Sequence, residues 1–133
     1  MGVIVIDASA LMPVLINGPE KEHIINATKN TELLAPSILP YEIGNALTRL
    51  KKRQILNDEQ IIAAYKDFMK IPLRLPETNI EKALEIACRY TIYAYDAYYL
   101  ETAFRLKAPI LTLDELMKKI ALDLNLQLLE VKL

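Results

Sequence analysis

The feature that most constrains the fold is a short apolar run near the N-terminus, Val3-Ile4-Val5-Ile6, which ends on Asp7. A run of β-branched residues with no polar interruption favours a strand that is buried on both faces. In open parallel α/β sheets, ligands bind beyond the carboxyl ends of the strands. The sequence therefore predicts that Asp7 lies at the edge of the sheet where binding and chemistry usually take place.

The size and composition of the chain exclude several classes of protein. A length of 133 residues fits one domain with a proper core. One Cys and one His exclude a disulfide framework and argue against a zinc site. Three glycines cannot build a dinucleotide-binding or Walker loop. A net charge of −1 excludes a basic field over the whole surface, so that any contact with nucleic acid must be local.

The distribution of apolar residues also bears on the compartment in which the protein works. No apolar run approaches the roughly 20 residues that span a bilayer. The first apolar segment is too short for a signal peptide and has no basic stretch before it. We therefore expect a cytoplasmic protein that makes no contact with a membrane.

Short strand-like runs alternate with longer helical ones along the chain. Strands are expected at 3–6, 32–35, 71–75, 109–113 and 127–131. Pro72 places the third of these at an edge of the sheet, because proline cannot donate to a strand pairing. The pattern predicts one three-layer α/β/α domain over residues 1–133, with a mostly parallel sheet of about five strands.

Several helix starts and one buried face can be assigned from local signals. Ser9 is expected to cap the first helix, and capping boxes pair Asn57 with Gln60 and Thr78 with Glu81. The helix after Thr78 has an apolar stripe whose members are expected to be buried. These are Ile80, Ala83, Leu84, Ala87 and Cys88.

Four acidic residues stand where the local pattern calls for another kind of residue. Glu42 and Asp96 lie on the apolar stripes of their helices, each within the first turn. Asp114 follows the apolar run 109–113 in the same way that Asp7 follows the first strand. All four would lie at the same edge of the sheet if the fold is a parallel α/β domain.

Each acid taken alone has a simpler explanation. Asp7 and Asp114 could cap the helices that follow them. An acid in a first turn complements the helix dipole, which would account for Asp96. Glu42 is harder to explain in this way because its place on the stripe directs it inward. The joint pattern favours one shared cause over four separate ones.

A cluster of four carboxylates limits what that cause can be. At an effective dielectric constant of about 20, their mutual repulsion exceeds ~10 kcal/mol, which is more than the net stability of many domains. Such a cluster persists when the acids bind a cation or take up protons. A ligand set made only of oxygens selects hard ions, Mg²⁺ or Mn²⁺ before Zn²⁺. The chemistry that this implies is phosphoester cleavage.

With these residues in place, the chain resembles the PIN domain family, and within it the toxin ribonucleases of the VapC type. The resemblance covers nearly the whole chain and rests on four segments in order. They are Asp7-Ala8-Ser9, Glu42-Ile43-Gly44-Asn45-Ala46-Leu47, Tyr95-Asp96-Ala97-Tyr98-Tyr99-Leu100 and Leu111-Thr112-Leu113-Asp114-Glu115.

The resemblance implies a PIN-like fold and an Mg²⁺- or Mn²⁺-dependent endoribonuclease that cleaves RNA phosphodiester bonds. It also implies the toxin of a type II toxin–antitoxin pair, with a cognate antitoxin protein and a homodimeric state. The acidic metal site would consist of Asp7, Glu42, Asp96 and Asp114. Ser9, Asn45 and Thr112 would be auxiliary polar residues near it.

Two other functions remain open on the sequence. One is a PIN-like scaffold that binds RNA or a protein without cutting. The other is a phosphoaspartate protein, either a receiver domain or a haloacid-dehalogenase-like phosphatase, although Asp7-Ala8-Ser9 supplies a single acid where those families use two. The run Lys51-Lys52-Arg53 closes a helix, where cations complement the dipole, and contact with RNA phosphates is its alternative role.

Overall fold

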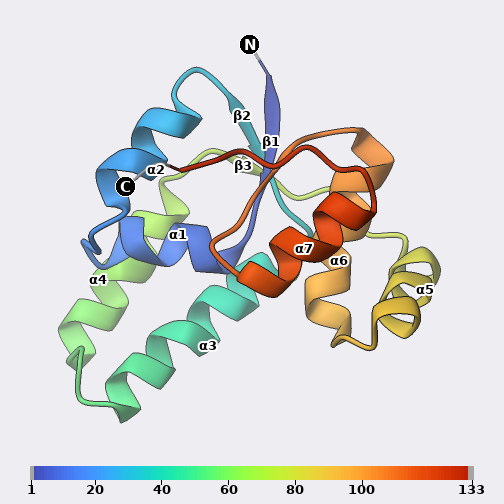
Figure 1. Cartoon of the computed structure of the whole chain (residues 1–133). Coiled ribbons are helices and arrows are strands. Elements are labelled where there is room, and N and C mark those ends of the chain that lie inside the picture. The colour runs from blue at the N-terminus through green and yellow to red at the C-terminus, as the bar shows by residue number, and fades with distance from the viewer. Residues whose placement is uncertain (1, 132–133) are drawn as a thin grey trace.

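A computed structural model describes residues 2–131 of the chain and contains a parallel sheet covered by helices on both faces (Figure 1). The strands are β1 (Val3–Ile6), β2 (Glu32–Leu34), β3 (Leu73–Arg74) and β4 (Ile110–Leu111). They are hydrogen-bonded in the order β3-β2-β1-β4, and every pair is parallel. The strand that ends on Asp7 is therefore central, as the sequence predicts.

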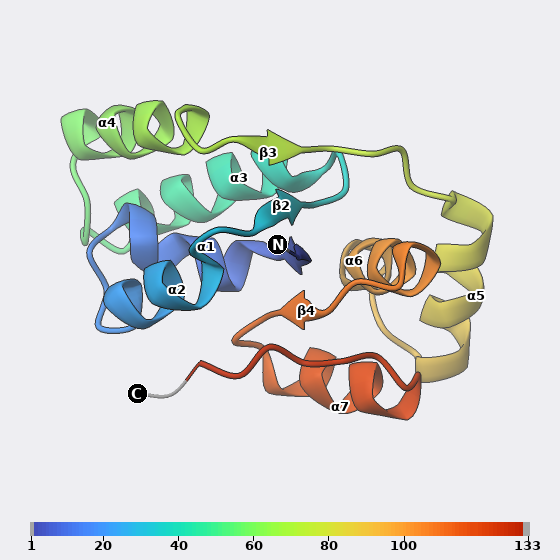
Figure 2. The same cartoon turned by 90° about the horizontal axis from the view of Figure 1, so that it is seen from above.

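The helices divide between the two faces of the sheet. They are α1 (Ala8–Leu15), α2 (Lys21–Thr28), α3 (Leu39–Lys52), α4 (Asp58–Met69), α5 (Ile80–Tyr90), α6 (Ala94–Leu106) and α7 (Glu115–Asp123). Figure 2 shows α1 to α4 on one side of the strands and α5 and α6 on the other. This three-layer arrangement confirms the predicted fold class. No helix among residues 2–131 has both the length and the apolar character needed to cross a bilayer.

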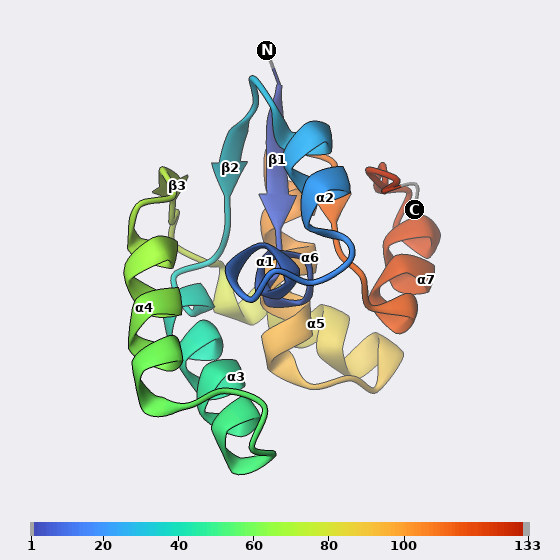
Figure 3. The ribbon, with the colours of Figure 1, turned by 90° about the vertical axis from the view of Figure 1, so that its left-hand side faces the viewer.

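The core forms around β1 and the helices that contact it. Val5 is fully buried in the centre of the sheet, and Leu100 of α6 is equally buried against it. Burial of apolar surface contributes about 25 cal/mol for each Å², so this core provides most of the favourable free energy of folding. It also fixes where β1 ends. Figure 3 shows α1 directly below the end of β1, with α3 on one side of it and α5 and α6 on the other.

The sheet has one strand fewer than the sequence suggested. The segment 127–131 forms a single parallel bridge, between Leu128 and Ile110, and no strand. Ile110 donates to the carbonyl oxygen of Gln127 and accepts from the N–H of Leu129. The pairing on this side of β4, which itself has two residues, stops at that one bridge. The expected edge strand around Pro72 is confirmed as β3.

Two of the expected helix caps are wrong by one or two residues. Asp7, not Ser9, caps α1, because its carboxylate accepts the N–H of Ala10 at 3.1 Å. The cap of α5 is Asn79, not Thr78. The capping box of Asn57 and Gln60 is confirmed at the start of α4.

The apolar stripe of α5 is only partly buried, contrary to the sequence prediction. Ala83 and Ala87 lie against Ala97 of α6 in a small satellite cluster. Cys88, which was expected to be buried, is exposed, and Leu84 is 47% exposed. Three alanines allow the two helices to approach closely over a narrow strip. The remainder of the stripe of α5 therefore faces outward.

Candidate active site

Four helix N-termini carry the four acids that the sequence singled out. Asp7 and Asp114 are the N-caps of α1 and α7, while Glu42 and Asp96 lie in the first turns of α3 and α6. The backbone N–H of Asp7 donates to the carbonyl oxygen of Leu111, which places the end of β1 beside the segment that leads to Asp114. The structure thus brings all four acids to the carboxyl edge of the sheet.

Asp7 is the most buried of the four and is held by a dense hydrogen-bond network. Its Oδ1 accepts from the hydroxyl of Ser9 at 2.7 Å, and its Oδ2 accepts from the hydroxyl of Thr112 at 2.6 Å. The two hydroxyls in turn accept the backbone N–H groups of Leu113 and Asp114, at 2.9 and 3.1 Å. This network ties the start of α1 to the loop before α7 and leaves Asp7 little rotational freedom.

Burial has a direct electrostatic consequence for Asp7. Desolvation, as the largest cause, raises the pKa of its carboxyl from 3.8 to about 6. The hydrogen bonds from Thr112, Ser9 and Ala10 lower the pKa, and the charge of Asp114 raises it. The charged form of Asp7 is therefore strained by burial, and a bound cation would relieve that strain.

Glu42 faces the same region from α3 and has one protein partner. The hydroxyl of Tyr99, on α6, donates to its carboxylate. Burial raises the pKa of Glu42 first, and the charges of Asp96 and Asp7 raise it further, whereas the bond from Tyr99 lowers it. Burial and then the bond to Glu42 raise the pKa of Tyr99, so its hydroxyl stays protonated and acts as a donor.

Asp96 and Asp114 complete the cluster. Burial raises the pKa of Asp96, and the nearby charge of Asp114 raises it as well. Asp114 is exposed, and its carboxylate accepts the N–H of Met117 at 2.9 Å. Asp114 therefore acts as a helix cap, which was one of the explanations considered for it from sequence, and it also adds negative charge to the cluster.

The acidic cluster has no cationic partner in the part of the chain that the structure describes. Within residues 2–131, none of the Lys and Arg side chains forms an ion pair with any of the four acids. Over the same residues, no group of three or more His, Cys, Asp or Glu side chains forms a ready-made set of metal ligands. The acids are thus neighbours at the range of electrostatic repulsion. An ion bound among them would be held partly through its own waters, which suits Mg²⁺.

The three auxiliary residues have different surroundings. Ser9 and Thr112 contact Asp7 directly, as described above. Asn45 lies one turn beyond Glu42 on α3 with an exposed side chain, and its side chain makes no hydrogen bond to the described acids. The contact between Tyr99 and Glu42 was not predicted from sequence.

A fifth acid with an inward position was also missed. Glu101 of α6 is almost fully buried, and its Oε1 accepts the backbone N–H of Asn79 at 2.8 Å. Its Oε2 accepts from Nε of Arg105 at the same distance. The signal in the sequence was an Arg four residues later on the same helix, a spacing that pairs the two side chains. Glu101 holds the start of α5 against α6.

A parallel α/β sheet with an acidic cluster at its carboxyl edge defines the class of protein. The PIN domain family model matches residues 4–122, and the chain belongs to the PIN domain family. This confirms the resemblance drawn from the four sequence segments. No curated protein matches the chain significantly.

Solved structures with a similar fold share little sequence with the chain. PAE2754 from Pyrobaculum aerophilum has a TM-score of 0.67 and 22% identity, over 90% of this chain and 87% of that one. VapBC2 from Rickettsia felis, bound to a DNA fragment from its promoter, has a TM-score of 0.65 and 17% identity, over 95% and 96%. Mycobacterium tuberculosis VapC20, a sarcin–ricin loop cleaving toxin, has a TM-score of 0.63 and 13% identity, over 87% and 93%.

Proposed function

We propose that the protein is a metal-dependent endoribonuclease, the toxin of a type II toxin–antitoxin pair, with Mg²⁺ or Mn²⁺ as its cofactor. One observation gives the strongest support to this proposal. Four carboxylates from four separate elements lie within electrostatic range of one another, and no Lys or Arg of residues 2–131 forms an ion pair with them. Such a cluster, with Asp7 buried and Glu42 and Asp96 partly buried, is unfavourable unless a positive charge is supplied.

The donor set fits a hard cation. Asp7, Glu42, Asp96 and Asp114 offer only oxygen atoms, and the described part of the chain adds no His or Cys to them. When bound, Mg²⁺ or Mn²⁺ would activate a water molecule and neutralise the charge that gathers on the phosphate. Whether one or two ions take part does not change the assignment of the ligands.

Hydroxyl groups of the protein orient two of the proposed metal ligands. The hydroxyls of Ser9 and Thr112 fix the orientation of Asp7. The hydroxyl of Tyr99 fixes Glu42. Pre-orientation of this kind lowers the cost of assembling the site when the cation and the phosphate arrive. Asp96 and Asp114 would complete the ligand set from the helices α6 and α7.

The proposal of a toxin is supported by the family and by the described activities of proteins with a similar fold. VapC20 is described as cleaving the sarcin–ricin loop, and VapBC2 is a complex bound to DNA from its promoter. By analogy we propose RNA as the substrate, a cognate antitoxin as the partner and the cytoplasm as the place of action. An Arg or Lys of the antitoxin would neutralise the acidic cluster in the inhibited state.

A cleavage assay tests the proposal. RNA is incubated with the protein in Mg²⁺, Mn²⁺ or EDTA, and Asp96→Asn is compared with Asp67→Asn, which removes an exposed acid on α4. We expect metal-dependent cleavage that Asp96→Asn lowers by about 10³-fold, the loss of several kcal/mol of transition-state stabilisation, while Asp67→Asn has no effect. RNA binding without cleavage would favour the scaffold alternative. Cleavage in EDTA would overturn the metal-dependent mechanism.

We also propose a homodimer. Ile80 and Leu84 of α5 are about half exposed, and Tyr41 at the start of α3 is 76% exposed. Tyr41, Ile80 and Tyr98 line a pocket of about 450 Å³. Exposed apolar and aromatic side chains that gather around one pocket are typical of subunit interfaces. Light scattering should show a dimer that Leu84→Glu converts to a monomer, with Ile62→Glu on α4 as the control.

A further inference from the structure

Two sides of α3 carry cations that have different surroundings. At about 100° for each residue, spacings of seven and eleven residues bring Arg49 and Arg53 to within about 20° of the direction of Glu42. The N–H of Arg53 donates to the carbonyl oxygen of Arg49, so the helical path continues to that residue. Glu42, Arg49 and Arg53 therefore lie along one side of α3.

The cation on the opposite side of α3 has an ion-pair partner within the protein. Lys51 is nine residues after Glu42, about 180° around the helix. It forms an ion pair with Asp58 at the start of α4. By contrast, Arg49, Lys52 and Arg53 form no ion pair and no side-chain hydrogen bond with any residue in the described range 2–131. Their charges are available to a ligand.

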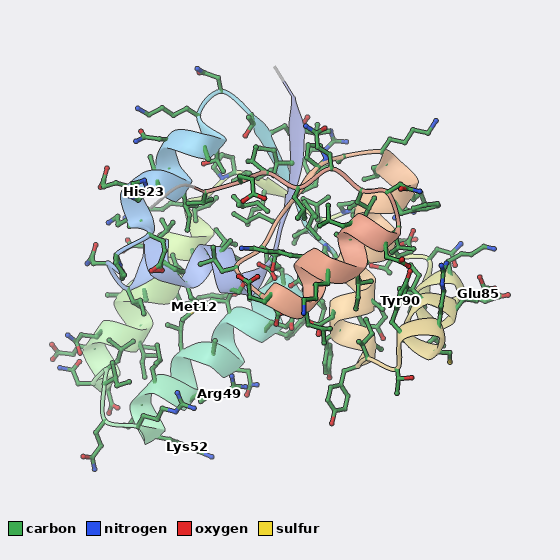
Figure 4. All side chains as sticks on the ribbon, in the orientation of Figure 1. Met12, His23, Arg49, Lys52, Glu85 and Tyr90 are labelled. Carbon is green, nitrogen blue, oxygen red and sulfur yellow. The ribbon has the colours of Figure 1, made fainter. Side chains whose placement is uncertain are left out.

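These free cations continue outward from the acidic cluster. α3 begins beside α1 and α7 and extends away from them, with Arg49 and then Lys52 toward its far end (Figure 4). With a rise of about 1.5 Å for each residue, Arg49 lies about 10 Å from Glu42 along the helix axis. That separation places Arg49 beyond the phosphate that would be cleaved, but within reach of a neighbouring part of the same strand.

We propose that α3 is the path of the RNA strand away from the cleavage site, with its phosphates bound by Arg49 and Arg53 and with Lys52 beside them. The inference rests on the proposed ribonuclease function and adds where the substrate lies. The acids repel a polyanion, and the chain has a net charge of −1. Binding of RNA therefore requires local cations, and phosphate contacts supply most of the affinity of such complexes.

An RNA-binding measurement tests the path. A short fluorescein-labelled single-stranded RNA is titrated with the Asp96→Asn protein in Mg²⁺, and anisotropy is followed at several salt concentrations. In that background, Arg49→Gln should weaken binding about fivefold at ~0.1 M salt, because each phosphate contact contributes about 0.7 to the slope of log K against log salt. Arg49→Gln with Arg53→Gln should lower the slope by about 1.4.

Lys51→Gln is the matched control. It removes the same charge from the same end of α3, and so it has the same effect on the helix dipole. We expect RNA affinity and salt slope to stay unchanged in this variant, and melting temperatures to be alike for Arg49→Gln and Lys51→Gln. Equal losses of affinity in the two variants, or no loss in Arg49→Gln, would overturn the proposed path. If Arg49→Gln kept its full affinity for RNA, an acidic protein partner would be the remaining ligand for the cations of α3.

The assay separates this inference from the proposed function, because it contains no cleavage step. A selective loss of RNA affinity in Arg49→Gln, together with no metal-dependent cleavage by the unmodified protein, would support the path and overturn the nuclease. Normal cleavage together with equal RNA affinities for Arg49→Gln and Lys51→Gln would overturn the path alone.

Discussion

The hydroxyl of Tyr99 donates to the carboxylate of Glu42, although the two residues are 57 positions apart in the chain. The bond joins the first half of α6 to the first turn of α3. Tyr99 is buried, so its ring cannot move away while the core stays packed. A core residue thereby sets the position of a proposed metal ligand.

Tyr99→Phe should leave the packing intact and weaken the site. The variant loses only the hydroxyl, and removal of a partner that orients a metal ligand typically costs about 10- to 100-fold in metal affinity. The bond from Tyr99 lowers the pKa of Glu42, so its loss should raise that pKa and move the acid limb of the rate profile to higher pH. Calorimetric titration with Mn²⁺ and a pH–rate profile measure the two effects.

Tyr98→Phe, one position earlier on α6, is the control for this prediction. Tyr98 packs against the alanine cluster between α5 and α6 and contacts the ring of Tyr95 edge-on. We expect unchanged Mn²⁺ affinity in that variant. If Tyr99→Phe also bound Mn²⁺ as tightly as the unmodified protein, Glu42 would not need the hydroxyl of Tyr99 to bind the metal.

The parts of the site that sequence could predict depend on local periodicity. Asp7 follows a run whose composition alone indicates a central strand. Glu42 and Asp96 interrupt stripes that repeat every three or four residues, so their direction relative to the core follows from their own helices. The carboxyl edge of a parallel sheet then brings them together. The fold class and the neighbourhood of the acids could be predicted in this way.

The contacts that sequence could not supply depend on how elements cross. The pairing of Tyr99 with Glu42 requires the relative placement of α6 and α3, which no local pattern encodes. Cys88 was wrongly expected to be buried because the apolar stripe of α5 is wider than the strip of alanines that contacts α6. The last strand was wrongly expected because the apolar pattern of 127–131 does not encode how far that segment pairs with β4, and the pairing stops at one bridge.

Asp7 should make the stability of the metal-free protein depend on pH. Its folded pKa of about 6 lies above the ordinary value of 3.8, so the folded state binds more protons than the unfolded state between those values. The free energy of unfolding in EDTA should therefore fall as the pH rises from about 4 to about 6, by up to about 3 kcal/mol. Urea denaturation at a series of pH values measures it.

Asp7→Asn should remove most of this dependence. The amide oxygen can still accept the N–H of Ala10 as a cap, but no charge is buried. At pH 8 in EDTA we expect the variant to be more stable by about 1–3 kcal/mol, while cleavage is lost. Asp67→Asn, which removes an exposed acid, should behave like the unmodified protein. A clear destabilisation of Asp7→Asn would mean that the hydrogen bonds of the carboxylate outweigh its burial.

Thr112→Val should destabilise the protein near neutral pH. The substitution removes the donor to Asp7, in a buried place, and the acceptor for the N–H of Asp114, in a partly buried one. Leaving such groups without partners costs about 1–3 kcal/mol each. Thr102→Val is matched in burial, but its hydroxyl only contacts the carbonyl oxygen of Tyr98 within α6. Its cost should be smaller in the same urea experiment. Equal costs would show that the network around Asp7 adds nothing to stability.

Glu101 and Arg105 offer the last prediction, on the attachment of α5. Arg105 is the only described cation paired with the buried Glu101 carboxylate, and it also donates to the carbonyl oxygen of Glu77 at 2.7 Å. Arg105→Ala should destabilise the protein by about 2–3 kcal/mol, because the buried charge of Glu101 loses its partner. The expected loss is at the low end for such a pair because Arg105 is partly exposed. Adding Glu101→Gln should restore part of the loss, because the amide oxygen can still accept the N–H of Asn79.

Hydrogen exchange would show which part of the protein loses stability in Arg105→Ala. The amides in the first turns of α5 should exchange faster in Arg105→Ala than in the unmodified protein, because Glu101 holds the start of that helix. Arg89→Ala breaks an exposed pair with Asp123 and should cost less than about 1 kcal/mol without a change in those amides. If Arg105→Ala and Arg89→Ala were equally mild, the buried carboxylate of Glu101 would not depend on its cation, and its bond to Asn79 alone would hold α5 in place.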